Sequence, residues 1–167
     1  MTNLRLALGV CASLLLAACQ AQQPQSASAP LELETLHRSA QCGTAAASLL
    51  GVPDQASLDS VLNAGMLGAT RTVTVDFAQR SVFRLSMGQQ PTAGASLAIT
   101  SLSVDSTHRR MTVNAVWKLP EPGSMQATVV TRPCVVFSVL RGDYRSARVI
   151  DSQQQQRLLV DLSAMAR

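Results

Sequence analysis

Residues 111–119 read Met-Thr-Val-Asn-Ala-Val-Trp-Lys-Leu, and this stretch decides the fold class. Its odd-numbered positions are all apolar, whereas Thr112, Asn114 and Lys118 are polar. Successive side chains of a strand point to opposite faces of a sheet, so this alternation predicts a strand with one buried and one exposed face. Half-buried strands of this kind are typical of antiparallel sheets.

The same alternation recurs along the rest of the chain. It predicts further strands at residues 31–35, 73–77, 83–87, 97–104, 135–139 and 158–162. The apolar positions change phase within 97–104, which indicates an extra residue, a β-bulge or bend, near Thr100 and Ser101. Turn-forming residues separate the strands at 88–94, 105–109, 120–123, 141–143 and 153–156.

Helical segments are few. Asp54 or Ser57 would cap one short helix with a single apolar stripe, and Gly65 is placed to end it. Residues 44–50 fit either a second short helix or a strand. We therefore predict a mainly β fold: a single antiparallel β-sandwich or partly open barrel with one or two short helices.

The N-terminus has the pattern of a secretion signal. Arg5 precedes an apolar run that ends in Leu16-Ala17-Ala18-Cys19 and is shorter than the roughly 20 residues of a membrane-spanning helix. The Leu-Ala-Ala-Cys end resembles the lipobox of bacterial lipoproteins. The resemblance implies that residues 1–18 are a signal peptide and that Cys19 receives fatty acyl chains, such as palmitate, which anchor it in a membrane. We interpret residues 19–30 as a flexible tether, since they lack charge and large apolar side chains beyond the cysteine.

The residue after Cys19 is Gln20, not the aspartate that retains many Gram-negative lipoproteins at the inner membrane. By this resemblance we expect the outer membrane, with the chain facing the periplasm. Cys11 leaves with the signal, so Cys42 and Cys134 are the only other cysteines of the mature chain. In an oxidising compartment they form either a disulfide or two separate buried thiols. A disulfide would contribute about 4–5 kcal/mol in the chain-entropy model.

The remaining residues, 31–167, are enough for one β-rich domain with its own core. The formal net charge of the chain is +4. It comes mostly from scattered arginines, without a long basic run or interleaved aromatic residues. We therefore expect no nucleic-acid partner.

The sequence contains no recognisable catalytic motif. Its two histidines, His37 and His108, accompany no Gly-x-Ser-x-Gly elbow, paired carboxylates or phosphate-binding glycine loop. No metal-ligand spacing joins them to the cysteines. Residues 141–143 match the integrin-binding tripeptide Arg-Gly-Asp, but Gly-Asp between two strands is ordinary hairpin chemistry. We predict a protein that is not an enzyme and that needs neither cofactor nor metal.

Several turns and strands between Val75 and Leu140 occur together in a fixed order. The order is Val75-Asp76-Phe77, Gly88-x-x-Pro91-Thr92-x-Gly94, Pro120-x-Pro122-Gly123 and Thr131-x-Pro133, with apolar strands between them. Over these residues, 75–140, the chain resembles the PrcB C-terminal domain family, named for the lipoprotein subunit of a bacterial surface protease complex. It departs from the family at Ala95 and Cys134, where the family usually carries aromatic residues.

The resemblance implies a β-rich accessory lipoprotein that binds another envelope protein, either an exported protease or a component of envelope assembly. Two turns are the expected partner contacts, through the residues Pro91, Thr92, Gly94, Pro120, Pro122 and Gly123.

Two other functions remain open. The Pro91–Gly94 loop also looks like the Asn-Pro-Thr-Thr-Gly loop of chagasin-type cysteine protease inhibitors, with Gln90 in the place of the asparagine. Protease inhibition through this loop is therefore one alternative. Binding of a small envelope ligand, a lipid or glycan, is the other, although no residue pattern argues for it.

Overall fold

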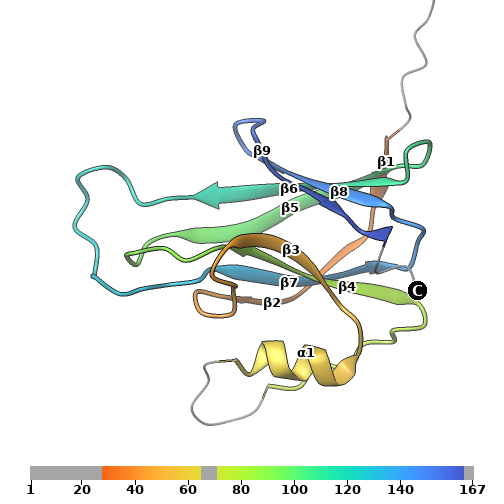
Figure 1. Cartoon of the computed structure of the whole chain (residues 1–167), viewed down its shortest axis with the longest axis horizontal. Coiled ribbons are helices and arrows are strands. Elements are labelled where there is room, and N and C mark those ends of the chain that lie inside the picture. Colours follow the sequence, from red (N-terminus) through yellow and green to blue (C-terminus); the bar gives the residue numbers. More distant parts are fainter. Residues whose placement is uncertain (1–27, 65–70, 164–167) are drawn as a thin grey trace, which may run out of the picture.

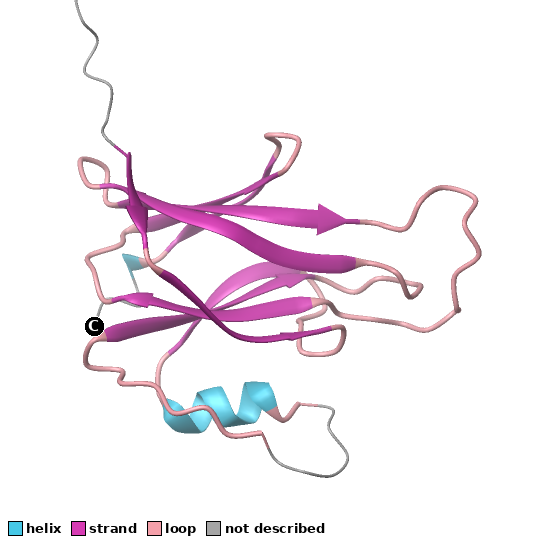
Figure 2. Ribbon diagram, turned by 180° about the vertical axis from the view of Figure 1, so that it is seen from behind, coloured by secondary structure: helices cyan, strands magenta, loops and turns pink. Residues whose placement is uncertain are grey.

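The computed structural model describes residues 28–64 and 71–163, which form two β-sheets packed face to face (Figure 1). Sheet A has the strand order β1 (Ser28–Leu31), β5 (Ser96–Asp105), β6 (Arg110–Lys118), β8 (Ser146–Asp151) and β9 (Gln156–Asp161). Sheet B has the order β2 (Leu33–Ser39), β7 (Cys134–Leu140), β4 (Arg80–Met87) and β3 (Ala47–Val52). The helix α1 (Gln55–Leu62) covers the outer face of sheet B (Figure 2). The mainly β prediction is confirmed, and the architecture is a sandwich.

The core between the sheets follows the alternation of the sequence. In β6, Met111, Val113 and Ala115 point inward and are at most 2% exposed. On the opposite sheet, Phe83 of β4 and Phe137 of β7 are paired across the strands, and their rings stack with centroids 5.6 Å apart. Aromatic pairs at this separation add to the stability gained from buried area.

A second apolar cluster lies between sheet B and α1. Asp54 caps the helix, because its side chain accepts a hydrogen bond of 2.7 Å from the backbone N–H of Ser57. Leu58 of the helix is fully buried against sheet B, where Val136 of β7 belongs to the same cluster. Strand β7 therefore lies between two cores, which explains why its first six residues, 134–139, are all buried.

The structure confirms most of the predicted strands and the predicted β-bulge. The pairing of β5 with β6 shifts register between Ile99 and Ser101. The predicted opening strand is split, because Leu31 pairs with β5 of sheet A and Leu33 pairs with β7 of sheet B. Residues 28–30, which the sequence assigns to the tether, belong to β1. Of the two alternatives for residues 44–50, the strand is observed, from Ala47 onward.

Two expectations about strands are wrong, and one strand is missed. Residues 73–77 pair with no strand of the described chain, and their alternation arises because Val73, Val75 and Phe77 pack against the helix cluster. The sequence does not predict β8, whose buried positions include the small residue Ala147. The sheets are not wholly antiparallel, because β8 pairs with β6 in parallel.

Three of the predicted turns lie in connections that cross between the two sheets, including the one interpreted as a hairpin at residues 141–143. Residues 88–95 join β4 to β5, residues 119–133 join β6 to β7, and residues 141–145 join β7 to β8. The last connection contains the Arg-Gly-Asp tripeptide. Its Asp143 forms an ion pair of 2.5 Å with Arg109, and Arg141 donates a hydrogen bond of 2.7 Å to the carbonyl of Phe77. These side chains hold the connection against its neighbours.

Some predictions lie outside the described residues. They concern the signal peptide 1–18, the lipidation of Cys19, most of the tether, and Gly65 at the end of the helix. Within residues 28–64 and 71–163, no helix is long and apolar enough to cross a membrane.

Candidate functional site

The first loop (residues 88–95) and the second loop (residues 119–133) lie side by side at one end of the sandwich, which we call the paired-loop end (Figure 1). Gln90 and Thr131 exchange two backbone hydrogen bonds, of 2.8 and 3.0 Å. Farther out, the N–H of Ala93 donates to the carbonyl of Ala127 over 3.0 Å. These backbone bonds make the two loops one surface.

Side chains strengthen the contact between the loops. The hydroxyl of Thr131 donates to the carbonyl of Thr92 over 3.2 Å, and Arg132 donates to the side chain of Gln89 over 3.0 Å. Gly94 has a φ of +92°, and a Cβ at this position would collide with the side chain of Gln126. The positive φ therefore favours a glycine here, whereas the contact with the flexible end of the exposed Gln126 side chain is relieved by a small side-chain movement.

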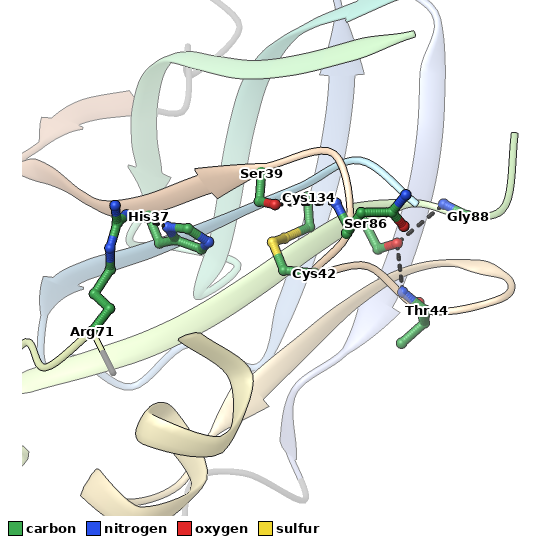
Figure 3. The surroundings of a disulfide bond; sticks show 9 residues. His37, Ser39, Cys42, Thr44, Arg71, Ser86, Gly88 and Cys134 are labelled. Atoms are coloured by element: carbon green, nitrogen blue, oxygen red, sulfur yellow. Dashed lines mark hydrogen bonds between the residues drawn. A yellow bond between two sulfur atoms is a disulfide. The ribbon is translucent and has the colours of Figure 1, made fainter. Parts of the chain in front are cut away.

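The base of the paired-loop end is fixed by a disulfide between Cys42 and Cys134, one of the two states that the sequence allowed (Figure 3). Both cysteines are buried, at 3% and 0% exposure. Beside them, the buried hydroxyl of Ser86 accepts hydrogen bonds from the N–H groups of Thr44 and Gly88, of 2.9 and 3.1 Å. The start of the first loop is thus held to the residues that follow β2.

The second loop is exposed and carries several large apolar side chains among polar ones. Every residue from 121 to 130 is exposed. The exposed fractions are 100% for Met125, 52% for Leu119 and Val129, and 49% for Val130. Sequence reasoning missed this feature, although Met125, Val129 and Val130 lie between predicted strands, in a stretch without regular alternation. We therefore treat this loop as a candidate interaction surface.

The six predicted contact residues fall in two places. Pro91, Thr92 and Gly94 lie in the first loop, and Pro120 lies against Gly94, since a Cβ on that glycine would be 3.4 Å from the proline Cγ. Pro122 and Gly123 lie in the wholly exposed part of the second loop, where a Cβ on Gly123 would meet no atom within 4 Å. The fold therefore brings four of the six together and leaves two at an outer tip.

The two histidines lie in separate ion-pairing or hydrogen-bonding contacts. His37 Nδ1 is 2.7 Å from a guanidinium nitrogen of Arg71 (Figure 3), and burial, followed by the charge of Arg71, lowers the pKa of His37. His108 Nδ1 is 2.7 Å from Asp105 in an exposed turn. Neither imidazole forms a hydrogen bond to a serine or cysteine of the described chain. Among the same residues, no group of three His, Cys, Asp or Glu side chains is arranged to hold a metal ion.

Residues 82–139 match the family model described as PrcB C-terminal. The chain thus resembles this family over the segment that runs from β4 through both loops to the end of β7. Neither the curated proteins nor the solved structures include a significant match. The matched segment contains both loops of the paired-loop end.

Proposed function

We propose that this protein is an accessory lipoprotein of the bacterial envelope that binds another protein, an exported protease, and catalyses no reaction itself. The observation that carries the proposal is the exposed apolar surface of Leu119, Met125, Val129 and Val130 on a loop held rigidly at its base. Exposed apolar side chains on a preorganised loop are favourable for association, because little conformational freedom is lost on binding. The resemblance to a family named for a protease-complex subunit supports the choice of partner.

The position of the first described residue suits this function. Ser28 pairs with Asp105, at the opposite end of sheet A from the paired-loop end (Figure 1). A lipid on Cys19 would therefore hold the chain by the end that lacks the apolar loop. An extended tether from Cys19 to Ser28 would reach about 30 Å, at about 3.4 Å per residue. In this arrangement the paired-loop end would face away from an outer-membrane anchor, toward soluble periplasmic partners.

The backbone of the first loop favours docking over inhibition by this loop alone. Here the carbonyl of Thr92 and the N–H of Ala93 are already bonded to the second loop. A partner must therefore contact both loops together. We accordingly expect the bound protease to remain active on small substrates.

Site-specific photocrosslinking in intact cells tests the docking surface. A photoreactive amino acid replaces Met125 in one variant and Leu140 in a control variant. Both side chains are exposed, at 100% and 46%, but Leu140 ends β7 at the opposite end of the sandwich. We expect a discrete crosslinked protein with the Met125 variant, identified by mass spectrometry as a protease, and none with the Leu140 variant. Equal labelling from the two positions, or no discrete product from Met125, would refute the proposal.

A further inference from the structure

Strand β6 extends beyond its neighbour β8. Their parallel pairing ends where Ala115 meets Asp151, whereas β6 continues to Lys118 with only β5 beside it. After Asp151 the chain turns through residues 152–155 into β9. One edge of residues 116–118 therefore has no strand beside it in the described part of the chain, and we call this edge the β6 ledge. An uncovered strand edge presents backbone donors and acceptors to which another chain can pair.

The β6 ledge forms one side of an open groove of about 430 Å³ at the paired-loop end. The groove is lined by residues 116–119 and, across from them, by Ser152, Gln153 and Arg157. Val116 and Leu119 are 36% and 52% exposed, and Trp117 is half-buried. The ledge side therefore offers both backbone groups and apolar side chains to a ligand.

The charged groups of the groove are cationic. Lys118 forms no ion pair with any described residue, and no carboxylate lines the groove. Arg157 uses its Nε to bond the buried carboxylate of Asp151 over 2.6 Å, and within the described chain its terminal nitrogens form no other hydrogen bond. Asp151 is further satisfied by the N–H groups of Gln153 and Gln155. Two cationic side chains thus line a groove that no carboxylate lines, and the carboxylate bonded to Arg157 also accepts two backbone hydrogen bonds.

We propose that this groove binds an extended peptide segment that carries a carboxylate. The segment pairs with the β6 ledge as a short added strand, packs an apolar side chain on Trp117 and Leu119, and places its carboxylate between Lys118 and Arg157. Recognition by strand addition draws affinity from main-chain hydrogen bonds and specificity from adjacent side-chain contacts. The inference deepens the proposed function and rests on it for the partner, since the segment would belong to the docked protein.

The chain carries two unique reporters inside the groove, because Trp117 is its one tryptophan and Lys118 its one lysine. The full chain in detergent is titrated with the acetylated pentapeptide Thr-Val-Thr-Val-Glu while tryptophan emission is followed. The rate of acetylation of the lysine is measured by mass spectrometry in parallel. We expect saturable binding with a Kd of about 0.1–1 mM and slower acetylation, since a short peptide buries little area.

Three further peptides show which groups of the peptide contribute to binding. One has a C-terminal amide, one has glutamine in place of glutamate, and one is N-methylated at alternate backbone nitrogens. We expect loss of binding with the N-methylated peptide, because it cannot pair with the ledge. If the terminal carboxylate is the recognised group, the amide peptide should bind more weakly. If the side-chain carboxylate is recognised, the glutamine peptide should bind more weakly. Undiminished binding of the N-methylated peptide would overturn strand addition.

Protein variants test the charge. Lys118→Glu should weaken binding by about tenfold or more, whereas Arg38→Glu, an exposed change on β2, should leave it unchanged. Lys118→Gln should fall between the wild type and Lys118→Glu. Equal affinity of all four proteins, or absence of saturable binding, overturns the inference. Since the Met125 crosslink measures docking without any peptide, its success beside a failed titration would leave the proposed function standing.

Discussion

The Cys42–Cys134 disulfide should contribute strongly to stability. The bond joins residues separated by 92 positions in the sequence. Closing a loop of that length lowers the entropy of the unfolded chain, and the chain-entropy relation gives about 4–5 kcal/mol at 25 °C. The free energy of unfolding of a typical domain is only about 5–15 kcal/mol, so the disulfide contributes a large fraction of it.

The test replaces both cysteines by alanine and follows urea unfolding of the full chain in detergent by circular dichroism. With a urea m-value of about 1.5 kcal/mol/M, the loss of about 4–5 kcal/mol lowers the unfolding midpoint by about 3 M. Both side chains are buried, so two small cavities add to the loss rather than offset it.

The matched control is the wild-type chain unfolded with and without a reductant. The reductant should leave the disulfide of the folded chain intact, because both cysteines are buried. Once urea unfolds the chain and exposes the disulfide, the reductant should break it and lower the urea midpoint. The reasoning is refuted if the double variant loses less than about 1 kcal/mol while mass spectrometry confirms an intact disulfide in the wild type.

Three other predictions concern a glycine pair, a buried carboxylate and a histidine. Gly88 and Gly123 both have a φ of +80°, but a Cβ on Gly88 would be 2.8 Å from the backbone nitrogen of Ala47 whereas one on Gly123 meets nothing. Gly88→Ala should therefore cost at least about 2 kcal/mol more in chemical unfolding than Gly123→Ala, and equal losses would contradict the packing argument. Burial acts to raise the pKa of Asp151, but hydrogen bonds from Gln155, Arg157 and Gln153 outweigh it, so the pKa is lowered. The stability that ionised Asp151 contributes is present above the ordinary carboxyl pKa of about 3.9 and is lost as the pH falls through the lowered pKa. Asp151→Asn should therefore be less stable than the wild type at pH 7 and should lose less stability on acidification. Parallel stability–pH profiles of the two proteins would refute this. Burial and then the charge of Arg71 lower the pKa of His37, so in an NMR titration its imidazole should protonate below the ordinary value of about 6.5, and Arg71→Ala should raise that pKa. An unchanged pKa of His37 in the variant would show that Arg71 does not lower it.

The sequence predicts the strands of the core well, because each has one buried and one exposed face. Met111, Val113 and Ala115 are recognisable in this way, and the capping side chain of Asp54 identifies the helix. The strand prediction fails where burial arises differently. Residues 73–77 alternate because they pack against the helix cluster and not because they form a strand. The strand at 135–139 is predicted, but the burial of both its faces is not, because that burial depends on the helix on the outer side of sheet B.

The candidate site was harder to predict than the core. Pro91 and Gly94 stand out in the sequence because they restrict or free the backbone, so the first loop was recognised. The partnership of the loops depends on Gln90 and Thr131, whose backbone groups pair across 41 residues of sequence, and backbone pairing leaves little trace in side-chain identity. The exposure of Met125 and Val129 likewise cannot be read from residue type, since apolar residues are usually buried.

The central position of β7 has a consequence for biosynthesis. The first partner of β7 in sheet B, β2, precedes it by about a hundred residues, as the contact between Glu34 and Ser138 across 104 positions illustrates. A chain in which β7 is not yet available therefore holds β2 without the strand that joins it to the β4–β3 pair, and Cys42 without its bonding partner. This chain should therefore depend on chaperones until β7 is available, after which one strand completes sheet B and brings the two cysteines together.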